Sequence, residues 1–170
     1  MKIVQSIIGI LLLQSLTLFG DVKFNFIYAD EPGTGFHIRP EAKSDLEKVG
    51  RLIGRKWLKH HNANIVIKVI SEKDAHKSYL ANARCASYLD NNKNGFHHSY
   101  LGKKIILGKN NNDKEFDGIL NVNFHRSFGF GNKVKLHQFD FQAILIHEIT
   151  HLLGFQSSYS KCPTSNKLLL

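Results

Sequence analysis

Residues 147–155 read His-Glu-Ile-Thr-His-Leu-Leu-Gly-Phe, and they follow an apolar run that begins at Phe139. Because an α-helix has 3.6 residues per turn, residues four apart lie on one face, about one turn from each other. His147 and His151 can therefore direct their ring nitrogens to one ion, and Glu148 reaches the side of that ion where a water would sit. Two imidazoles, a polarised water and a carboxylate base are the groups that a hydrolytic Zn²⁺ site requires.

The motif lies in a segment that we expect to form a core helix, because the residues before and after it are mostly apolar. Asp140 is a suitable N-cap and Gly154 a suitable residue to end the helix, which gives a length of about fourteen residues. Polar side chains inside such a helix are costly unless they are satisfied, and a metal ion would satisfy them. The alternative is a core helix whose histidines hydrogen-bond to the backbone.

The sequence around the motif resembles the zincin metallopeptidases, and Gly154 makes it similar to the metzincin branch. The likeness extends from Asp117 to Ser158 and includes N-x-N-F at 121–124 and Phe-Asp-Phe at 139–141, as in a group of secreted zincin-like proteins. It implies a zinc metalloendopeptidase in which His147 and His151 bind Zn²⁺, lowering the pKa of its water towards about 7. It further implies that Glu148 moves the proton of this water to the leaving amine.

The chain departs from the metzincin pattern at the third zinc ligand, where Ser157 stands in place of His or Asp. No His, Asp or Glu follows His151, and Met1 is the only methionine, so the methionine turn of metzincins is also missing. We therefore expect a domain at 21–170 that is incomplete at its carboxy terminus, and the alternative function is a catalytically inactive zincin scaffold with a binding role. The remaining candidates for a third ligand are Ser157, Tyr159, Cys162, His125 and His137.

The order of elements predicts an α+β fold with a mixed, mostly parallel twisted sheet and a backing helix. The resemblance implies that this is a zincin-like amino-terminal subdomain and that the helix with His147 and His151 is its active-site helix. We expect the backing helix at 41–60 and a short helix containing Cys85 within 72–89. The strands are expected at 22–29, 65–70, 104–107 and 118–124. By the resemblance, strand 118–124 is the sheet edge beside the cleft, where an extended peptide adds as a further strand; the alternative is an ordinary half-buried strand.

Three loops contain residues that suggest a site. Phe128 and Phe130, in the loop before the active-site helix, either line a substrate pocket or fill the core beneath the loop. His97 and His98 are adjacent, so their side chains point apart, and we expect two exposed loop histidines rather than a metal site. The segment 109–114 offers Asn and Asp oxygens to a hard cation, although a solvated turn is the commoner use of such residues.

The amino terminus predicts secretion. Lys2 and the mostly apolar segment 3–19 resemble a secretory signal peptide, so that residues 1–20 are removed and the protein is extracellular. The alternative, an uncleaved anchor, would need a longer and purer apolar segment. In an oxidising compartment Cys85 and Cys162 are compatible with a disulfide, and a zinc-bound thiolate at Cys162 is the alternative.

Length and charge limit the remaining possibilities. A chain of 170 residues with 42% apolar residues suggests one domain with a real core. The formal net charge is +9, but Lys and Arg are scattered among Asp and Glu, so we expect a protein or peptide substrate and no nucleic acid. We also expect a monomer without stable membrane insertion after signal cleavage. A basic protein that binds polyanions, in which the motif is incidental, is the second alternative.

Overall fold

The computed structural model describes residues 20–85, 99–108, 115–155, 160–161 and 168–169. Almost all of the predicted signal peptide lies outside these residues, and so do His97, His98 and the loop 109–114. Within the described ranges, no helix combines the length and the apolar character needed to cross a membrane.

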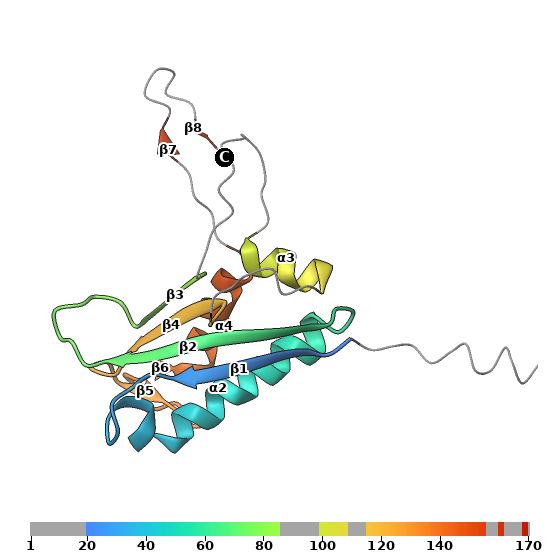
Figure 1. Cartoon of the computed structure of the whole chain (residues 1–170). Helices are drawn as coiled ribbons and strands as arrows, with labels where there is room; N and C mark the ends of the chain where they lie inside the picture. Colours follow the sequence, from blue (N-terminus) through green and yellow to red (C-terminus); the bar gives the residue numbers. More distant parts are fainter. Residues whose placement is uncertain (1–19, 86–98, 109–114, 156–159, 162–167, 170) are drawn as a thin grey trace, which may run out of the picture.

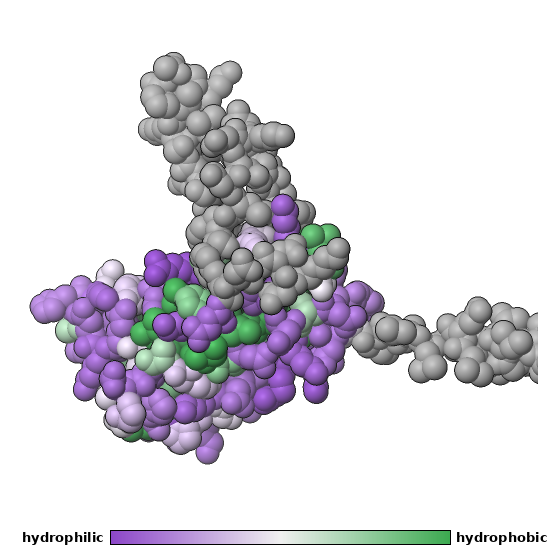
Figure 2. Space-filling model, in the orientation of Figure 1, coloured by the Kyte–Doolittle hydropathy of each residue, from purple (hydrophilic) through white to green (hydrophobic). Residues whose placement is uncertain are grey.

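Four strands form one mixed sheet in the order β1-β2-β4-β3 (Figure 1). Strands β1 (Val22–Tyr28), β2 (Ala63–Glu72) and β4 (Gly118–Asn123) are parallel, whereas β3 (Ala81–Cys85) runs antiparallel to β4. The prediction of an α+β fold with a mixed, mostly parallel sheet is therefore confirmed. In the view of Figure 1, apolar residues gather over the middle of the sheet and hydrophilic residues cover most of the remaining described surface (Figure 2).

Helices connect and cover the strands. A 3₁₀ turn, η1 (Gly35–Ile38), leads into α2 (Pro40–Leu52), which continues as one π-helical turn, η2 (Ile53–Trp57), before β2 begins. The predicted helix at 41–60 is thus confirmed in place but ends before His60. Helix α4 (Phe141–Leu152) follows two short paired strands, β5 (Phe128–Gly129) and β6 (Phe139–Asp140). Two further strands, β7 (Ser160–Lys161) and β8 (Leu168–Leu169), pair antiparallel.

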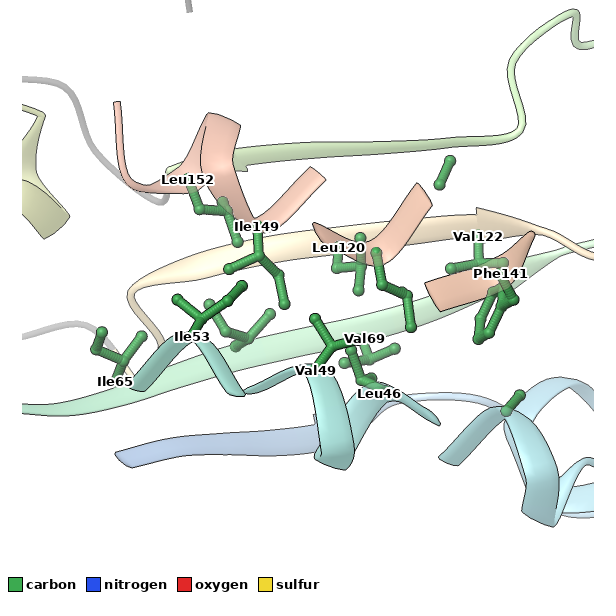
Figure 3. Close-up of a cluster of buried hydrophobic side chains, with 14 of the residues drawn as sticks. Leu46, Val49, Ile53, Ile65, Val69, Leu120, Val122, Phe141, Ile149 and Leu152 are labelled. Atoms are coloured by element: carbon green, nitrogen blue, oxygen red, sulfur yellow. The ribbon is translucent and has the colours of Figure 1, made fainter. Parts of the chain in front are cut away.

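The core lies between the sheet and helices α2 and α4. Alternate residues of β2 and β4 are fully buried, as expected for strands with one face against helices. Figure 3 shows the side chains that meet there: Leu46, Val49 and Ile53 from the α2 segment, Ile149 and Leu152 from α4, and Ile65, Val69, Leu120 and Val122 from the sheet. Helix α4 is thereby attached to the sheet through its apolar face.

Two predicted elements are wrong. Residues 104–107, predicted as a strand, belong to helix α3 (Tyr100–Leu107). The Ser99 hydroxyl accepts a hydrogen bond from the Gly102 N–H at 3.0 Å and caps the helix, while Gly108 ends it at φ +62°. The segment 72–89, predicted as a short helix, contains β3 instead. Its backbone pairs with β4, and the five residues of so short a strand do not reveal such a partner by themselves.

The buried hydroxyl of Tyr28 allows a test of what an unsatisfied polar group costs in stability. Its hydroxyl has no hydrogen-bond partner, and burial, followed by the charges of Glu47 and Asp30, raises its pKa from 10.0 to about 12. We expect Tyr28→Phe to leave the free energy of unfolding at neutral pH unchanged or to raise it by about 1 kcal/mol, because an unsatisfied hydroxyl is removed. The raised pKa implies that wild-type stability falls as pH rises from 10.0 to about 12.

Urea unfolding of both proteins at neutral and alkaline pH measures this difference. Tyr28→Phe should lose less stability than the wild type over the alkaline interval, because it has no phenol at this position to ionise. The ring keeps its contacts, including Phe36 at 5.3 Å between centroids. A clear loss of stability at neutral pH would show that the hydroxyl is satisfied in solution.

Candidate active site

Helix α4 has the boundaries that its sequence predicts. The Asp140 carboxylate accepts a hydrogen bond from the Ala143 N–H at 3.1 Å and caps the first turn. At the other end Gly154 has φ +98°, the left-handed conformation that ends a helix. The face that carries Leu145 and Ile149 is fully buried, whereas His147 is exposed. The helix therefore fixes the motif between the core and the surface.

The two histidines of the motif converge. Their Nε2 atoms lie 2.9 Å apart, and their rings are nearly perpendicular, with 4.4 Å between centroids. Two imidazole nitrogens bound to one tetrahedral zinc ion, each about 2.0–2.1 Å from it, would lie roughly 3.3 Å apart. A small rotation of either ring would give this separation. The predicted pairing of His147 and His151 on one face is thus present in the structure.

The orientation of His151 is set by a backbone carbonyl. Its Nδ1 lies 3.0 Å from the Phe155 carbonyl oxygen, so a proton on Nδ1 is donated to that oxygen and the lone pair remains on Nε2. Gly154 makes this contact possible, because its positive φ turns the chain back towards the helix. Histidines that bind metals commonly donate their other ring N–H in this way. Apart from Gly154, no residue of the motif indicates that the Phe155 carbonyl would have this role.

Glu148 lies between α4 and strand β3. The residue is 7% exposed, and its carboxylate accepts a hydrogen bond from the Ala83 N–H. Burial raises the pKa of Glu148, while the electrostatic effect of His147 and His151 and the hydrogen bond from the Ala83 N–H act in the opposite direction. A carboxyl group with a raised pKa beside two imidazoles is suited to accept and return a proton.

Strand β3, and not β4, forms the edge of the sheet beside Glu148. Strand β4 pairs with β2 on one side and β3 on the other, so the prediction that 118–124 is the edge is wrong. The Asn123 N–H donates to the Leu80 carbonyl at 2.9 Å, so backbone groups of alternate residues from Leu80 onward face β4. Those of Ala81, Ala83 and Cys85 face the open edge, where Ala83 meets Glu148.

Asn123 fixes the approach to this edge strand. Its side chain is fully buried; its Oδ1 accepts from the N–H groups of Asp74 and His125, and its Nδ2 donates to the Asp74 carbonyl at 2.8 Å. Two residues earlier on β4, the Asn121 side-chain amide donates to the side-chain oxygen of Asn82, its partner on β3, at 2.9 Å. The two asparagines of the N-x-N-F segment therefore hold β3 and the loop before it, a role that sequence reasoning did not identify.

Of the other proposed ligands, the structure describes only His125 and His137, and neither joins the histidine pair. Among the residues that the structure describes, no group of three or more His, Cys, Asp and Glu side chains is placed to hold a metal ion. His125 and His137 are both exposed, and His137 has a positive φ of 69°. Ser157, Tyr159 and Cys162 lie outside the described residues. Among the described residues, the structure thus brings together His147 and His151 and adds no third candidate ligand to them.

Cys85 is a buried free thiol that donates to the Leu152 carbonyl at 3.2 Å. Burial raises the pKa of this thiol, so it stays protonated at neutral pH. It joins the end of β3 to the last turn of α4. The disulfide with Cys162 that the sequence suggested is absent at Cys85.

The aromatic residues of the loop before α4 fill the core. Phe128 is 6% exposed and contacts Phe141 edge-on, with 5.1 Å between ring centroids. Phe130 contacts the same ring at 5.1 Å and is partly buried. Asp45 of α2 holds this loop, because its carboxylate accepts from the Gly131 N–H at 2.8 Å and from the Gln142 amide at 2.7 Å. Core packing is the alternative observed for Phe128, whereas Phe130 packs against the core and also lines a cavity beside α2.

Comparisons of the chain with protein families, with curated proteins and with solved structures find no match. The function is therefore argued from the site itself.

Proposed function

We propose that this chain is a zinc-dependent metalloendopeptidase of the zincin type, with a protein or peptide as its substrate. The convergence of the His147 and His151 Nε2 atoms beside Glu148 is the observation that supports the proposal most strongly. Their placement on one exposed helical face gives both imidazoles to a single ion, and the Phe155 carbonyl keeps the His151 Nε2 lone pair free. When bound there, Zn²⁺ would polarise the substrate carbonyl and lower the pKa of a water.

The residues of the chain perform the remaining chemistry. Glu148 takes a proton from the attacking water and passes it to the leaving amine. Its raised pKa supports the first transfer, because a more basic carboxylate takes the proton of the water more readily. An extended peptide would add to the open edge of β3, where the backbone groups of Ala81 and Cys85 flank the Ala83 N–H. This edge would place the peptide beside Glu148.

The two-ligand set favours one alternative, an inactive zincin scaffold with a binding role. Catalytic zinc sites have three protein ligands in most proteins, and the described residues supply only His147 and His151. Secretion after removal of residues 1–20 stays a prediction, as does the monomeric state. The zinc affinity of the chain decides between the two functions.

Zinc content of the purified protein, measured by elemental analysis, tests the proposal. We expect about one zinc per chain, and loss of the metal to background in a His147→Ala/His151→Ala double variant. His37→Ala/His76→Ala is the matched control, because it removes two exposed histidines that are not candidate ligands and should keep the zinc. A wild-type chain that takes up no zinc, even from excess metal, would leave the inactive scaffold as the function.

A further inference from the structure

A cavity of about 340 Å³ lies at the carboxyl ends of the parallel strands, apart from the histidine pair. Its walls are the segment 33–39, which leads from β1 into α2, the residues 71–73 at the end of β2, and Phe124 after β4. Ligands of open α/β sheets commonly bind outside the carboxyl ends of parallel strands, in cavities of roughly 300–1,000 Å³. None of its lining residues belongs to α4, so the cavity is separate from the histidine pair.

One wall of this cavity is fixed by Asp30. One carboxylate oxygen accepts from the Ser71 N–H at 2.6 Å and the other from the Phe36 N–H at 2.8 Å, which ties the segment after β1 to β2. The two segments approach so closely at Gly35 that only glycine fits there. Its φ is +51°, and a Cβ would lie 1.8 Å from the Ser71 hydroxyl oxygen. The shape of the wall therefore does not depend on a ligand.

Arg39, which also lines the cavity, is held in place by two contacts. Its Nη1 donates to the Gly35 carbonyl at 2.9 Å, and its guanidinium carbon lies 4.5 Å from the centroid of the Phe124 ring. A guanidinium has five N–H donors, so a side chain fixed through one of them still offers a fork of donors to a ligand. Its immobilisation lowers the entropy that binding would cost.

The charges of the lining residues match a singly charged anion. Arg39 and Lys73 are cationic and Glu72 is the carboxylate among them. Hydrogen bonds from Lys77 and then Tyr79 lower the pKa of Glu72, so this carboxylate is ionised and already partnered. The cavity also offers apolar surface, from the Phe124 ring and from Ile38, which is 57% exposed.

We propose that this cavity binds a small organic carboxylate that carries an apolar group. The planar carboxylate would pair with the Arg39 guanidinium, which matches it in geometry, and Lys73 would add a second contact at the rim. The apolar group would cover Phe124 and Ile38. Both a free acid and the carboxy-terminal residue of a peptide have this chemistry. The proposal does not depend on zinc at the histidine pair.

Calorimetric titration of the full chain with phenylacetate and with N-acetylphenylalanine, each beside its neutral amide, tests the proposal. We expect at least one acid to bind about tenfold or more tightly than its amide, because charged hydrogen bonds contribute about 1.5–3 kcal/mol. Binding of both acids would indicate a free acid as ligand. Binding of N-acetylphenylalanine alone would indicate a peptide carboxy terminus. Amides that bind as tightly as the acids, or inorganic phosphate that does so, would overturn the proposal.

Arg39→Gln should abolish the binding of the acids. Arg51→Gln is its matched control, because Arg51 is an exposed residue of α2 that pairs with Glu47 at 3.6 Å, and it should bind as the wild type does. Lys73→Gln, at an exposed position, should weaken binding severalfold and tests the cavity even if Arg39→Gln unfolds. Affinity that survives both Arg39→Gln and Lys73→Gln would place the ligand elsewhere.

Discussion

Glu148→Gln is expected to reduce peptide hydrolysis about 10²–10⁴-fold, the range that positioned acid–base groups contribute, while the zinc content stays near that of the wild type. Glutamine has nearly the same shape as glutamate, and its amide oxygen can still accept the Ala83 N–H. It cannot take up a proton from water at neutral pH. The variant therefore removes proton transfer and keeps the position of the helix and of both histidines.

The measurement is the cleavage of a mixed peptide library, followed by mass spectrometry, with zinc determined on the same samples. Glu47→Gln is the control, because Glu47 is an exposed carboxylate of α2 whose only described ion pair is with Arg51. It should cleave as the wild type does. Undiminished cleavage by Glu148→Gln would remove Glu148 from the mechanism. Zinc binding without cleavage by the wild type would favour the binding function.

The sequence predicts helix α4 well, because the residues that mark its ends and its histidine face lie within or next to the helix itself. Asp140 and Gly154 mark the two ends, and the spacing of His147 and His151 fixes their shared face, whatever the rest of the chain does. Strand β3 shows the limit of such signals. It is a strand because β4 lies beside it, and its own five residues carry only a weak alternating pattern.

The candidate site was predictable in its side chains and not in its backbone. The Phe155 carbonyl that orients His151 and the Ala83 N–H that meets Glu148 are groups that every residue possesses, so residue identity cannot point to them. The edge strand was misplaced for a related reason. Pairing partners depend on how the whole sheet assembles. Strand β4 comes to lie between β2 and β3, and β3 pairs with it in the antiparallel direction and so forms the edge.

Lys104→Ala is expected to lower the free energy of unfolding by about 3–5 kcal/mol, because it removes a buried ammonium that pairs with a buried carboxylate. The Lys104 ammonium lies 2.7 Å from the Asp117 carboxylate, and the two side chains are only 7% and 2% exposed. The same Asp117 oxygen accepts the Val66 N–H of β2 at 2.8 Å. The pair therefore attaches α3 to the start of β4 and to β2, in a place that water hardly reaches.

Urea unfolding of three variants separates the ion pair from the helix that carries it. Lys103→Ala removes the neighbouring, exposed lysine of α3 and should change stability by no more than about 0.5 kcal/mol. A double variant, Lys104→Met with Asp117→Asn, should recover most of the loss, because the asparagine oxygen still accepts the Val66 N–H and no buried charge remains. If Lys104→Ala were as stable as Lys103→Ala, the ion pair would contribute little to stability, and the buried apolar residues Leu101 and Ile105 would matter more than Lys104 for attaching α3.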